Sequence, residues 1–368
     1  MLWNMHRLYY KILKDMEKKV LITGITGQDG ANLVEYLLIN TTVKIFGMIR
    51  RTSNPNFINC QAFIKNERFQ LVYGDLSDSV SLDNLIRDIQ PDYFINFAAQ
   101  SFVGCSWDIP LQTFDANATG VARCLEAIRR FQPKCRFYSA GSSEEFGDVQ
   151  YSPQDILHPV KPRSPYGASK AAARHLVKVY RESYNLYAVH GILFNHEGTK
   201  RGEEFVTRKI SKGIARIYHA IKNNQPFAPI ELGNLDAKRD WSDSEDFVDG
   251  VWKMLNQKKP KDYILSSNET YTIREFVNKA FEHAGIYGVW HGYGQEEQMS
   301  VSTEYAIKNE VQSSVLIKIN PKFYRPAEVE LLLGDSTPAR EELGWKPKIS
   351  FDNLVERMVK YDIDNFKI

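Results

Sequence analysis

Two groups of residues near the middle of the chain could together perform hydride transfer. Tyr166 and Lys170 stand four positions apart, so on a helix they would share one face. The lysine ammonium could then hold the phenol as phenolate near neutral pH, which a free tyrosine with a pKa of about 10 does not reach. The triplet Ser142-Ser143-Glu144 precedes this pair and offers a second acid–base group.

A predicted strand positions the triplet. The apolar run 136–141 ends directly before Ser142, and ligands of open parallel sheets bind at the carboxyl ends of the strands. We therefore expect Glu144 and Tyr166 to reach the same crevice. Tyr-x-x-x-Lys also occurs by chance in helices, so this prediction depends on the rest of the chain.

The start of the chain carries a dinucleotide-binding pattern. A β-branched run at 20–22 leads to Gly24, Gly27 and Gly30, and helical periodicity follows from Ala31. Glycine permits the tight turn and the close approach of the backbone to a pyrophosphate at the helix N-terminus. A glycine-rich turn without a ligand is the alternative.

Two arginines favour NADP over NAD. A predicted second strand, 44–49, ends in Arg50 and Arg51, where a carboxylate would bind the ribose of NAD. Arginines suit the 2′-phosphate of NADP instead, and two solvated loop arginines are the alternative. A third strand, 70–76, brings Asp75 to the same edge, where it could meet the adenine.

Strands and helices alternate over most of the chain. Further strands are predicted at 93–101 and 187–194, with helices at 81–89 and 117–131. This order predicts an α/β fold with a Rossmann-type doubly wound parallel sheet and a smaller, interleaved C-terminal substrate domain. The segment 285–312 carries little periodicity and is expected to include a mobile loop.

Composition is that of an ordinary globular protein. The 368 residues are 43% hydrophobic and 25% charged, with a net charge of +2, which gives no argument for nucleic-acid or membrane partners. No apolar run approaches the roughly 20 residues of a membrane span. The four cysteines show no Cys-x-x-Cys spacing, so we expect no metal site, no disulfide framework and a cytoplasmic location.

With these motifs, the chain resembles the extended short-chain dehydrogenase/reductases and, among them, the GDP-mannose 4,6-dehydratase family. The likeness extends over 19–362 and includes both predicted domains. Its most specific segments are 24–30, 98–101, 194–197, 201–210, 233–241 and 324–330.

The resemblance implies a role for each candidate catalytic residue. Tyr166 would take the proton of the sugar 4-hydroxyl while the C4 hydride passes to NADP. Glu144 would then take the C5 proton, and water would leave C6 with help from Ser142. Lys170 would lower the pKa of Tyr166 and hold the nicotinamide ribose. The hydride returns to C6, so the net reaction is a dehydration.

The resemblance also implies binding positions, domain bounds and a homo-oligomer, either a dimer or a tetramer. The cofactor positions are Gly24, Thr26, Gly27, Gln28, Asp29, Gly30, Arg50, Arg51, Asp75, Leu76, Phe97, Ala98, Ala99, Gln100, Ser101, Tyr166, Lys170, His196 and Arg201. The positions for the GDP-sugar are Ser101, Ser142, Ser143, Glu144, Asn195, Val206, Lys209, Gly233, Arg239, Arg325 and Glu328. The expected parts are an N-terminal extension at 1–17, an NADP-binding domain at 18–196 plus 232–263, and a GDP-sugar-binding domain at 197–231 plus 264–368.

The chain departs from the family pattern at three places. Ser142 replaces the usual threonine and keeps the hydroxyl. Phe102-Val103-Gly104 stands where the family usually has His-Val-Lys, and Gly198-Thr199-Lys200 where it has Ser-Pro-Arg. The last two concern the sugar more than the reaction, so a GDP-manno-heptose is the alternative substrate. A 4-keto-sugar reductase or epimerase, which needs no Glu144, and a non-catalytic NADP-binding regulator are the alternative functions.

Overall fold

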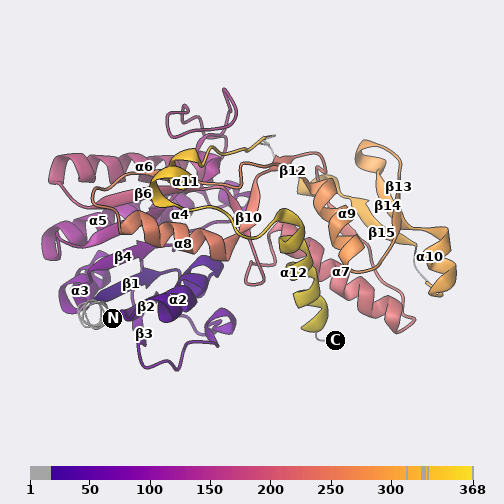
Figure 1. The fold of residues 1–368 in the computed structure, drawn as a ribbon, viewed down its shortest axis with the longest axis horizontal. Helices are drawn as coiled ribbons and strands as arrows, with labels where there is room; N and C mark the ends of the chain where they lie inside the picture. Colours follow the sequence, from indigo (N-terminus) through magenta and orange to yellow (C-terminus); the bar gives the residue numbers. More distant parts are fainter. Residues whose placement is uncertain (1–17, 312–313, 325–328, 330, 367–368) are drawn as a thin grey trace, which may run out of the picture. The chain divides into compact units, whose positions relative to one another are not determined.

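The computed structural model describes residues 18–311, 314–324, 329 and 331–366, and these form two compact units (Figure 1). Unit 1 comprises 18–194, Ser244–Leu265 and Gly334–Lys346. Unit 2 comprises Asn195–Asp243, 266–333 and 347–366 in their described parts. The expected N-terminal extension, 1–17, lies outside the described residues.

The units differ from the expected domains at two longer segments, and by two residues each at 195–196 and 264–265. Residues 232–243 belong to unit 2, because β9 (Lys238–Arg239) pairs with β12 (Tyr271–Thr272) there. Residues 334–346 belong to unit 1, where Trp345 is buried and its indole N–H donates to the Asp246 carbonyl at 2.7 Å. Both attachments are made by residues distant in sequence, so neither has a local signal.

Unit 1 is built on a seven-stranded sheet in which every pair of neighbours is parallel. The strand order is β11-β6-β5-β4-β1-β2-β3, and it reverses direction between β1 and β4. The strands are β1 (Lys19–Thr23), β2 (Lys44–Ile49), β3 (Phe69–Tyr73), β4 (Tyr93–Asn96), β5 (Arg136–Ala140), β6 (Ala188–Leu193) and β11 (Tyr263–Leu265). The predicted α/β class with a doubly wound parallel sheet is confirmed.

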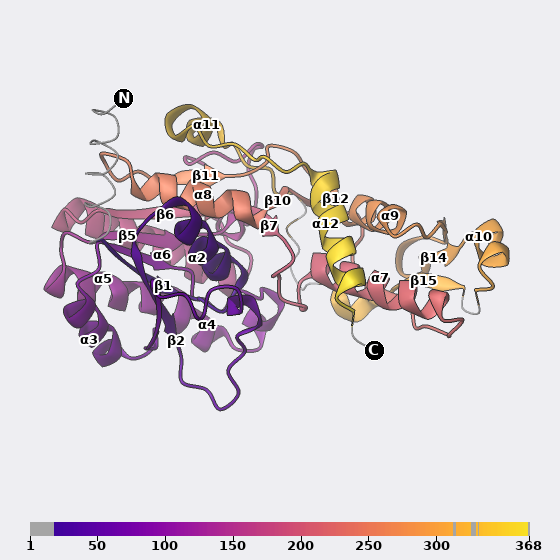
Figure 2. The same ribbon diagram turned by 60° about the horizontal axis from the view of Figure 1, so that its bottom comes forward.

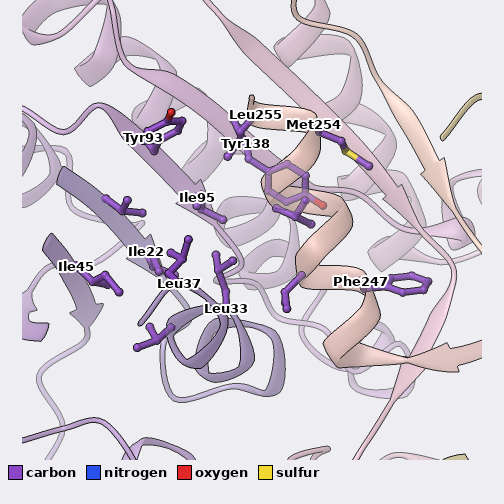
Figure 3. Packing of buried hydrophobic residues seen from close by; sticks show 14 of the residues in the cluster. Ile22, Leu33, Leu37, Ile45, Tyr93, Ile95, Tyr138, Phe247, Met254 and Leu255 are labelled. Atoms are coloured by element: carbon purple, nitrogen blue, oxygen red, sulfur yellow. The ribbon is translucent and has the colours of Figure 1, made fainter. Parts of the chain in front are cut away.

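Helices cover both faces of this sheet because alternate strand residues point to opposite sides. Tyr138 packs with Leu33 of α2 and Phe247 of α8 on one face (Figure 3), whereas Phe137 packs with Leu125 of α5 on the other. The helices of unit 1 are α2 (Gln28–Asn40), α3 (Ser79–Ile89), α4 (Pro110–Phe114), α5 (Gly120–Phe131), α6 (Pro165–Tyr184), α8 (Ser244–Leu255) and α11 (Thr337–Leu343).

Unit 2 packs helices against a small mixed sheet of order β13-β14-β15-β8 (Figure 2). Its strands are β8 (Ile230–Leu232), β13 (Gly288–His291), β14 (Gln298–Val301) and β15 (Val315–Ile319). Its helices are α7 (Val206–Lys222), α9 (Ile273–His283), α10 (Thr303–Lys308) and α12 (Phe351–Asp364). A further pair joins β7 (Asn195–Glu197) to β10 (Trp241–Asp243).

The weakly periodic segment 285–312, expected to include a mobile loop, contains regular secondary structure in its described part. Residues 285–311 contain β13, β14 and α10. The two strands are short and pair with each other in antiparallel register, and β14 also pairs with β15. Such strands are stabilised by cross-strand neighbours rather than by a periodic pattern of their own.

The described residues contain no helix that is both long and apolar enough to cross a bilayer. Within the same residues, no three His, Cys, Asp or Glu side chains come together as a metal site would require.

Candidate active site

The glycine turn between β1 and α2 is a close-packed cradle. Gly24 has a φ of +70°, and a Cβ there would lie 2.7 Å from the Ala98 nitrogen. A Cβ at Gly30 would lie 2.4 Å from the Gly24 carbonyl oxygen. Gly27 caps α2 with no side-chain hydrogen bond. The turn therefore presents backbone to a ligand at a helix N-terminus, which suits the pyrophosphate of a dinucleotide.

A threonine ties this turn to the segment after β4. The Thr23 hydroxyl donates to Asn96 Oδ1 at 2.6 Å and accepts from the Ala98 N–H at 3.1 Å. The residues predicted to line the cofactor, Phe97, Ala98, Ala99, Gln100 and Ser101, thus begin beside the glycine turn, where the strand order reverses. Ligands of doubly wound sheets bind at this reversal.

Gln100 and Asn117 hold the segment after β4 in place. The Gln100 side chain accepts from the Phe102 N–H at 2.7 Å and donates to Thr113 at 3.2 Å, so it braces its own loop. The Asn117 side chain accepts from the Gln100 backbone N–H at 2.8 Å. It also donates to the Gln100 backbone carbonyl at 2.9 Å and to the Ser169 hydroxyl at 3.0 Å.

Asn117 is a site-forming residue that the sequence analysis missed. It is buried in the π-helical turn Asp115–Thr119 before α5. Ser169, its partner, lies on α6 between Tyr166 and Lys170. The sequence predicted a helix at this place, but nothing in its periodicity distinguishes a buried asparagine that joins a loop to α6.

The Ser-Ser-Glu triplet is held by a capping box. Ser142 is the N-cap of the short helix Ser143–Glu145, and its hydroxyl accepts from the Glu144 N–H at 3.3 Å. The carboxylate of Glu145 accepts from the Ser142 N–H at 2.8 Å. Glu144 is 9% exposed. Both orphan donors of this helix start are thereby satisfied, which fixes the backbone that carries Ser142 and Glu144.

Helix α6 packs directly against the triplet. Ser164 caps it by accepting from the Gly167 N–H at 3.0 Å, and Pro165 follows at the first helical position. A Cβ at Gly167 would lie 2.5 Å from the Glu144 carbonyl oxygen. Tyr166, the residue before this glycine, is therefore brought beside the triplet.

Tyr166 and Lys170 lie on the same face of α6 and are both buried. The Lys170 Nζ atom is 5.9 Å from the centroid of the Tyr166 ring and donates to the Ala140 carbonyl at 2.7 Å. Burial lowers the pKa of Lys170 to about 8, against the opposing influence of the Glu145 and Asp29 carboxylates. A cation next to the phenol ring favours the phenolate that a base requires.

The remaining cofactor positions of unit 1 differ in what they offer. Arg50 and Arg51 follow β2 and are exposed. The Asp75 carboxylate accepts from the Ser77 N–H at 2.9 Å, whereas the Leu76 side chain belongs to the core. Only the backbone of Leu76 is thus available to a ligand. In the glycine turn, the Thr26 carbonyl accepts from Asn59 at 3.1 Å, and Gln28 donates to Asp29 at 3.1 Å.

Unit 2 contains the other two predicted cofactor positions, His196 and Arg201, and the remaining predicted positions for the GDP-sugar that the structure describes. Asn195 and His196 lie on β7, and Asn195 Oδ1 is buried with no hydrogen-bond donor among the described residues. The Arg201 guanidinium forms an ion pair with Glu197 at 3.0 Å and lies 3.5 Å from the Phe205 ring centroid.

Phe323 brings two further predicted positions together. Lys209 Nζ lies 3.3 Å from the Phe323 ring centroid, and burial lowers the pKa of this lysine. A Cβ at Gly233 would lie 2.6 Å from the Phe323 carbonyl oxygen. Val206 begins α7 one turn before Lys209.

Arg239 is buried, and its guanidinium donates to the Val329 carbonyl at 2.7 Å. The other two positions predicted for the nucleotide, Arg325 and Glu328, lie outside the described residues.

Comparison with known proteins gives a consistent result. A family model described as GDP-mannose 4,6 dehydratase matches residues 21–358. A GDP-mannose 4,6 dehydratase of Drosophila melanogaster is 44% identical over 356 residues, covering 95% of this chain and 87% of the relative. The protein of that name from Homo sapiens is 42% identical, covering 94% of this chain and 91% of its own length.

Solved structures share the fold at lower identity. A dTDP-glucose 4,6-dehydratase from Streptomyces venezuelae, solved with NAD bound, superposes with a TM-score of 0.76 at 20% identity, covering 94% of this chain and 97% of that one. The RMD protein of Pseudomonas aeruginosa, solved with NADPH, gives a TM-score of 0.70 at 21% identity, covering 94% and 99%.

Proposed function

The chain belongs to the GDP-mannose 4,6 dehydratase family, and from this premise we propose that it converts GDP-mannose to GDP-4-keto-6-deoxymannose with loss of water. The observation that carries the proposal is the packing of the triplet against the start of α6, beside Tyr166 and Lys170. Oxidation at C4 and elimination across C5 and C6 require separate bases. The triplet supplies the second one.

Each residue of the site has one task. Tyr166 removes the proton of the sugar 4-hydroxyl, and the Lys170 ammonium stabilises the phenolate that does so. The resulting 4-keto group acidifies the C5–H bond, and Glu144 takes that proton. The hydroxyl of Ser142 hydrogen-bonds to the C6 oxygen as the C6–O bond breaks, and the leaving hydroxyl takes the proton from Glu144 and departs as water. C5 regains a proton from solvent when the hydride returns to C6, and Tyr166 releases its proton to solvent. Bound NADP would accept the C4 hydride and return it to C6.

Residues of unit 1 fit a nicotinamide dinucleotide. The glycine cradle at the start of α2 accommodates a pyrophosphate because a Cβ at Gly24 or Gly30 would fill it. We propose NADP rather than NAD because Arg50 and Arg51 follow β2, where the 2′-substituent of the adenosine ribose binds in this fold. Their exposed guanidinium groups can donate to a 2′-phosphate.

Replacing both arginines should change the choice of cofactor. We expect Arg50→Gln/Arg51→Gln to weaken NADP binding about 100-fold, since two charge-assisted hydrogen bonds are lost. NAD binding should change less than about threefold, because NAD has no 2′-phosphate to lose a contact. Calorimetric titration of the cofactor-free protein with each dinucleotide measures both affinities. Equal losses for the two cofactors would contradict the assignment.

A second pair of adjacent arginines provides the control. Arg129 and Arg130 stand at the end of α5, and each forms an ion pair on the surface of unit 1, with Glu126 at 2.8 Å and Asp83 at 2.7 Å. Arg129→Gln/Arg130→Gln removes the same charge from the same unit. It should leave both affinities unchanged.

The reaction itself is tested without added cofactor. Purified protein is incubated separately with GDP-mannose and with a GDP-manno-heptose, and loss of water is followed by mass spectrometry. Water loss from GDP-mannose supports the proposal and, since no cofactor was added, shows a bound dinucleotide that is restored in each turnover.

Water loss from the GDP-manno-heptose alone would support the dehydratase reaction but would show that the substrate is the heptose rather than GDP-mannose. The alternative substrate is suggested by Phe102, which is 40% exposed, and by Gly104, because the family usually has polar side chains at these two positions. No reaction with either sugar, even after addition of NADP, would contradict the dehydratase. Reduction of a 4-keto-sugar would then identify the alternative reductase.

We also propose a cytoplasmic homo-oligomer, as the family suggests.

A further inference from the structure

We propose that Glu145 and His190 form a buried pair that positions the Ser142–Glu144 backbone and stabilises the positive charge of Lys170. The inference rests on the proposed function, for which it makes Glu145 a positioning residue. Both side chains are 0% exposed and 2.9 Å apart. Neither can touch a substrate, so any effect must pass through the residues that they hold.

One carboxylate oxygen makes both contacts. Glu145 Oε1 accepts from the Ser142 N–H at 2.8 Å and lies 2.9 Å from His190 Nε2. A Cβ at Gly141 would lie 2.3 Å from His190 Nε2 and 2.8 Å from Glu145 Oε1. Glycine at 141 is therefore required for the pair to form. The pair holds the backbone at the residue where the triplet begins.

His190 is in turn anchored to the sheet. It lies on β6, opposite Ser139 of β5. Its backbone N–H donates to the Asp262 carboxylate at 2.7 Å. Arg181 forms two hydrogen bonds with the same aspartate, at 2.6 and 2.8 Å. The imidazole is thus a fixed point to which the loop after β5 is attached through Glu145.

Glu145 and Lys170 contact the same short segment after β5: Lys170 Nζ donates to the Ala140 carbonyl at 2.7 Å, and Glu145 Oε1 accepts from the Ser142 N–H at 2.8 Å. Burial would raise the pKa of Glu145, but His190, the Ser142 N–H and Arg174 outweigh it and lower that pKa, so the carboxylate is ionised. Among the groups facing Lys170, Glu145 opposes the effect of burial more than Asp29 of α2 does. Burial, with the Asp29 and Glu145 charges, raises the pKa of the neighbouring Tyr138, which is therefore neutral and adds no charge.

Stability alone does not explain such a pair. Burying a carboxylate with a polar partner is often no more stabilising than apolar residues of the same volume, and Glu145 Oε2 is buried with no hydrogen-bond donor among the described residues. Burying the Glu145 carboxylate with one unpaired oxygen is energetically unfavourable. Its presence between the triplet and Lys170 is therefore consistent with a role in the reaction.

Glu145→Gln tests this role because the amide oxygen still accepts from Ser142 while the charge is lost. In the wild type, a lysine with a pKa of about 8 loses its proton as the pH rises through that value, so activity should fall on the alkaline side there. In the variant, we expect this decline to begin about one pH unit lower, because the anion that favours the ammonium is gone. We expect kcat near pH 7 to fall about tenfold.

The Michaelis constant and two further variants separate positioning from folding. KM for GDP-mannose should stay within about twofold, since Glu145 lies away from the substrate. His190→Gln removes the neighbour that most lowers the pKa of Glu145, so it should move the alkaline decline in the same direction as Glu145→Gln. If Glu145→Gln does not fold, the double variant Glu145→Gln/His190→Gln removes both members of the pair and should show the same shift. Failure of both to fold, or an unshifted pH profile in a folded variant, would overturn the proposal.

A measurement without turnover distinguishes this inference from the proposed function. Lys170 is acetylated competitively over a range of pH in the full chain with its bound cofactor, and the modified peptide is quantified by mass spectrometry. Acetylation requires the neutral amine, so it should begin at lower pH in Glu145→Gln than in the wild type. This shift is expected even if the protein does not dehydrate GDP-mannose, whereas identical acetylation profiles would refute the inference alone.

Discussion

Glu144→Gln should stop the dehydration while leaving the oxidation at C4 intact. The amide cannot take the C5 proton, so we expect the 4-keto intermediate and the reduced nicotinamide cofactor to accumulate on the enzyme. General bases contribute about 100- to 10,000-fold to rate, and we expect formation of the 6-deoxy product to fall by about 1,000-fold. The absorbance of the reduced nicotinamide after mixing with GDP-mannose measures the oxidation, and mass spectrometry measures the loss of water.

An exposed glutamate of the same unit serves as the control. Glu182 lies on α6, and its side chain is exposed. Glu182→Gln makes the same chemical change outside the site and should retain wild-type rates. Normal dehydration by Glu144→Gln would refute the assignment of the C5 base. It would also favour a reaction that needs no such base, as in the reductase alternative.

Tyr166→Phe should block the first step itself. Without the phenol oxygen no group takes the proton of the 4-hydroxyl, so hydride transfer from C4 should slow by about 1,000-fold. No reduced nicotinamide should appear, which distinguishes this variant from Glu144→Gln. Because the ring and the packing of α6 are kept, thermal unfolding should occur close to the wild-type temperature.

A tyrosine at the other end of the same helix provides a matched control. Tyr184 ends α6 and is 50% exposed, and Tyr184→Phe should leave the reaction unchanged. An NADPH signal from Tyr166→Phe comparable to that of Glu144→Gln would count against the tyrosine as the C4 base. The two signals together therefore assign the two bases independently.

Much of the fold was predictable because its signals are local. The strand, glycine turn and helix at the start of the chain follow one another directly, and the structure has them as β1, the turn and α2. The strand at Lys44–Ile49 was predicted with the bounds that the structure gives. The parallel arrangement of the strands was predicted from the alternation of strands and helices along the chain. This alternation can be recognised without knowing any tertiary contact.

The secondary structure of unit 2 was harder to predict from local sequence signals. Its strands β13 and β14 have four residues each and pair with each other and with β15 rather than following a pattern of their own. The bounds of the two units likewise depend on β9 joining β12 and on Trp345 packing in unit 1. These choices are made by tertiary contacts, so the periodicity of a single segment does not contain them.

The proposed chemistry of the candidate site could be inferred from the amino-acid sequence alone. The spacing of Tyr166 and Lys170 on one helix and the order of triplet and strand are fixed by local geometry. The contacts that hold these residues in place become visible only in the folded protein. Asn117 joins a loop to α6 across a sequence separation of 52, and Glu145 meets His190 across a separation of 45. Both contacts depend on how strands and helices are brought together in three dimensions, because burial and pairing act between residues that no sequence pattern connects.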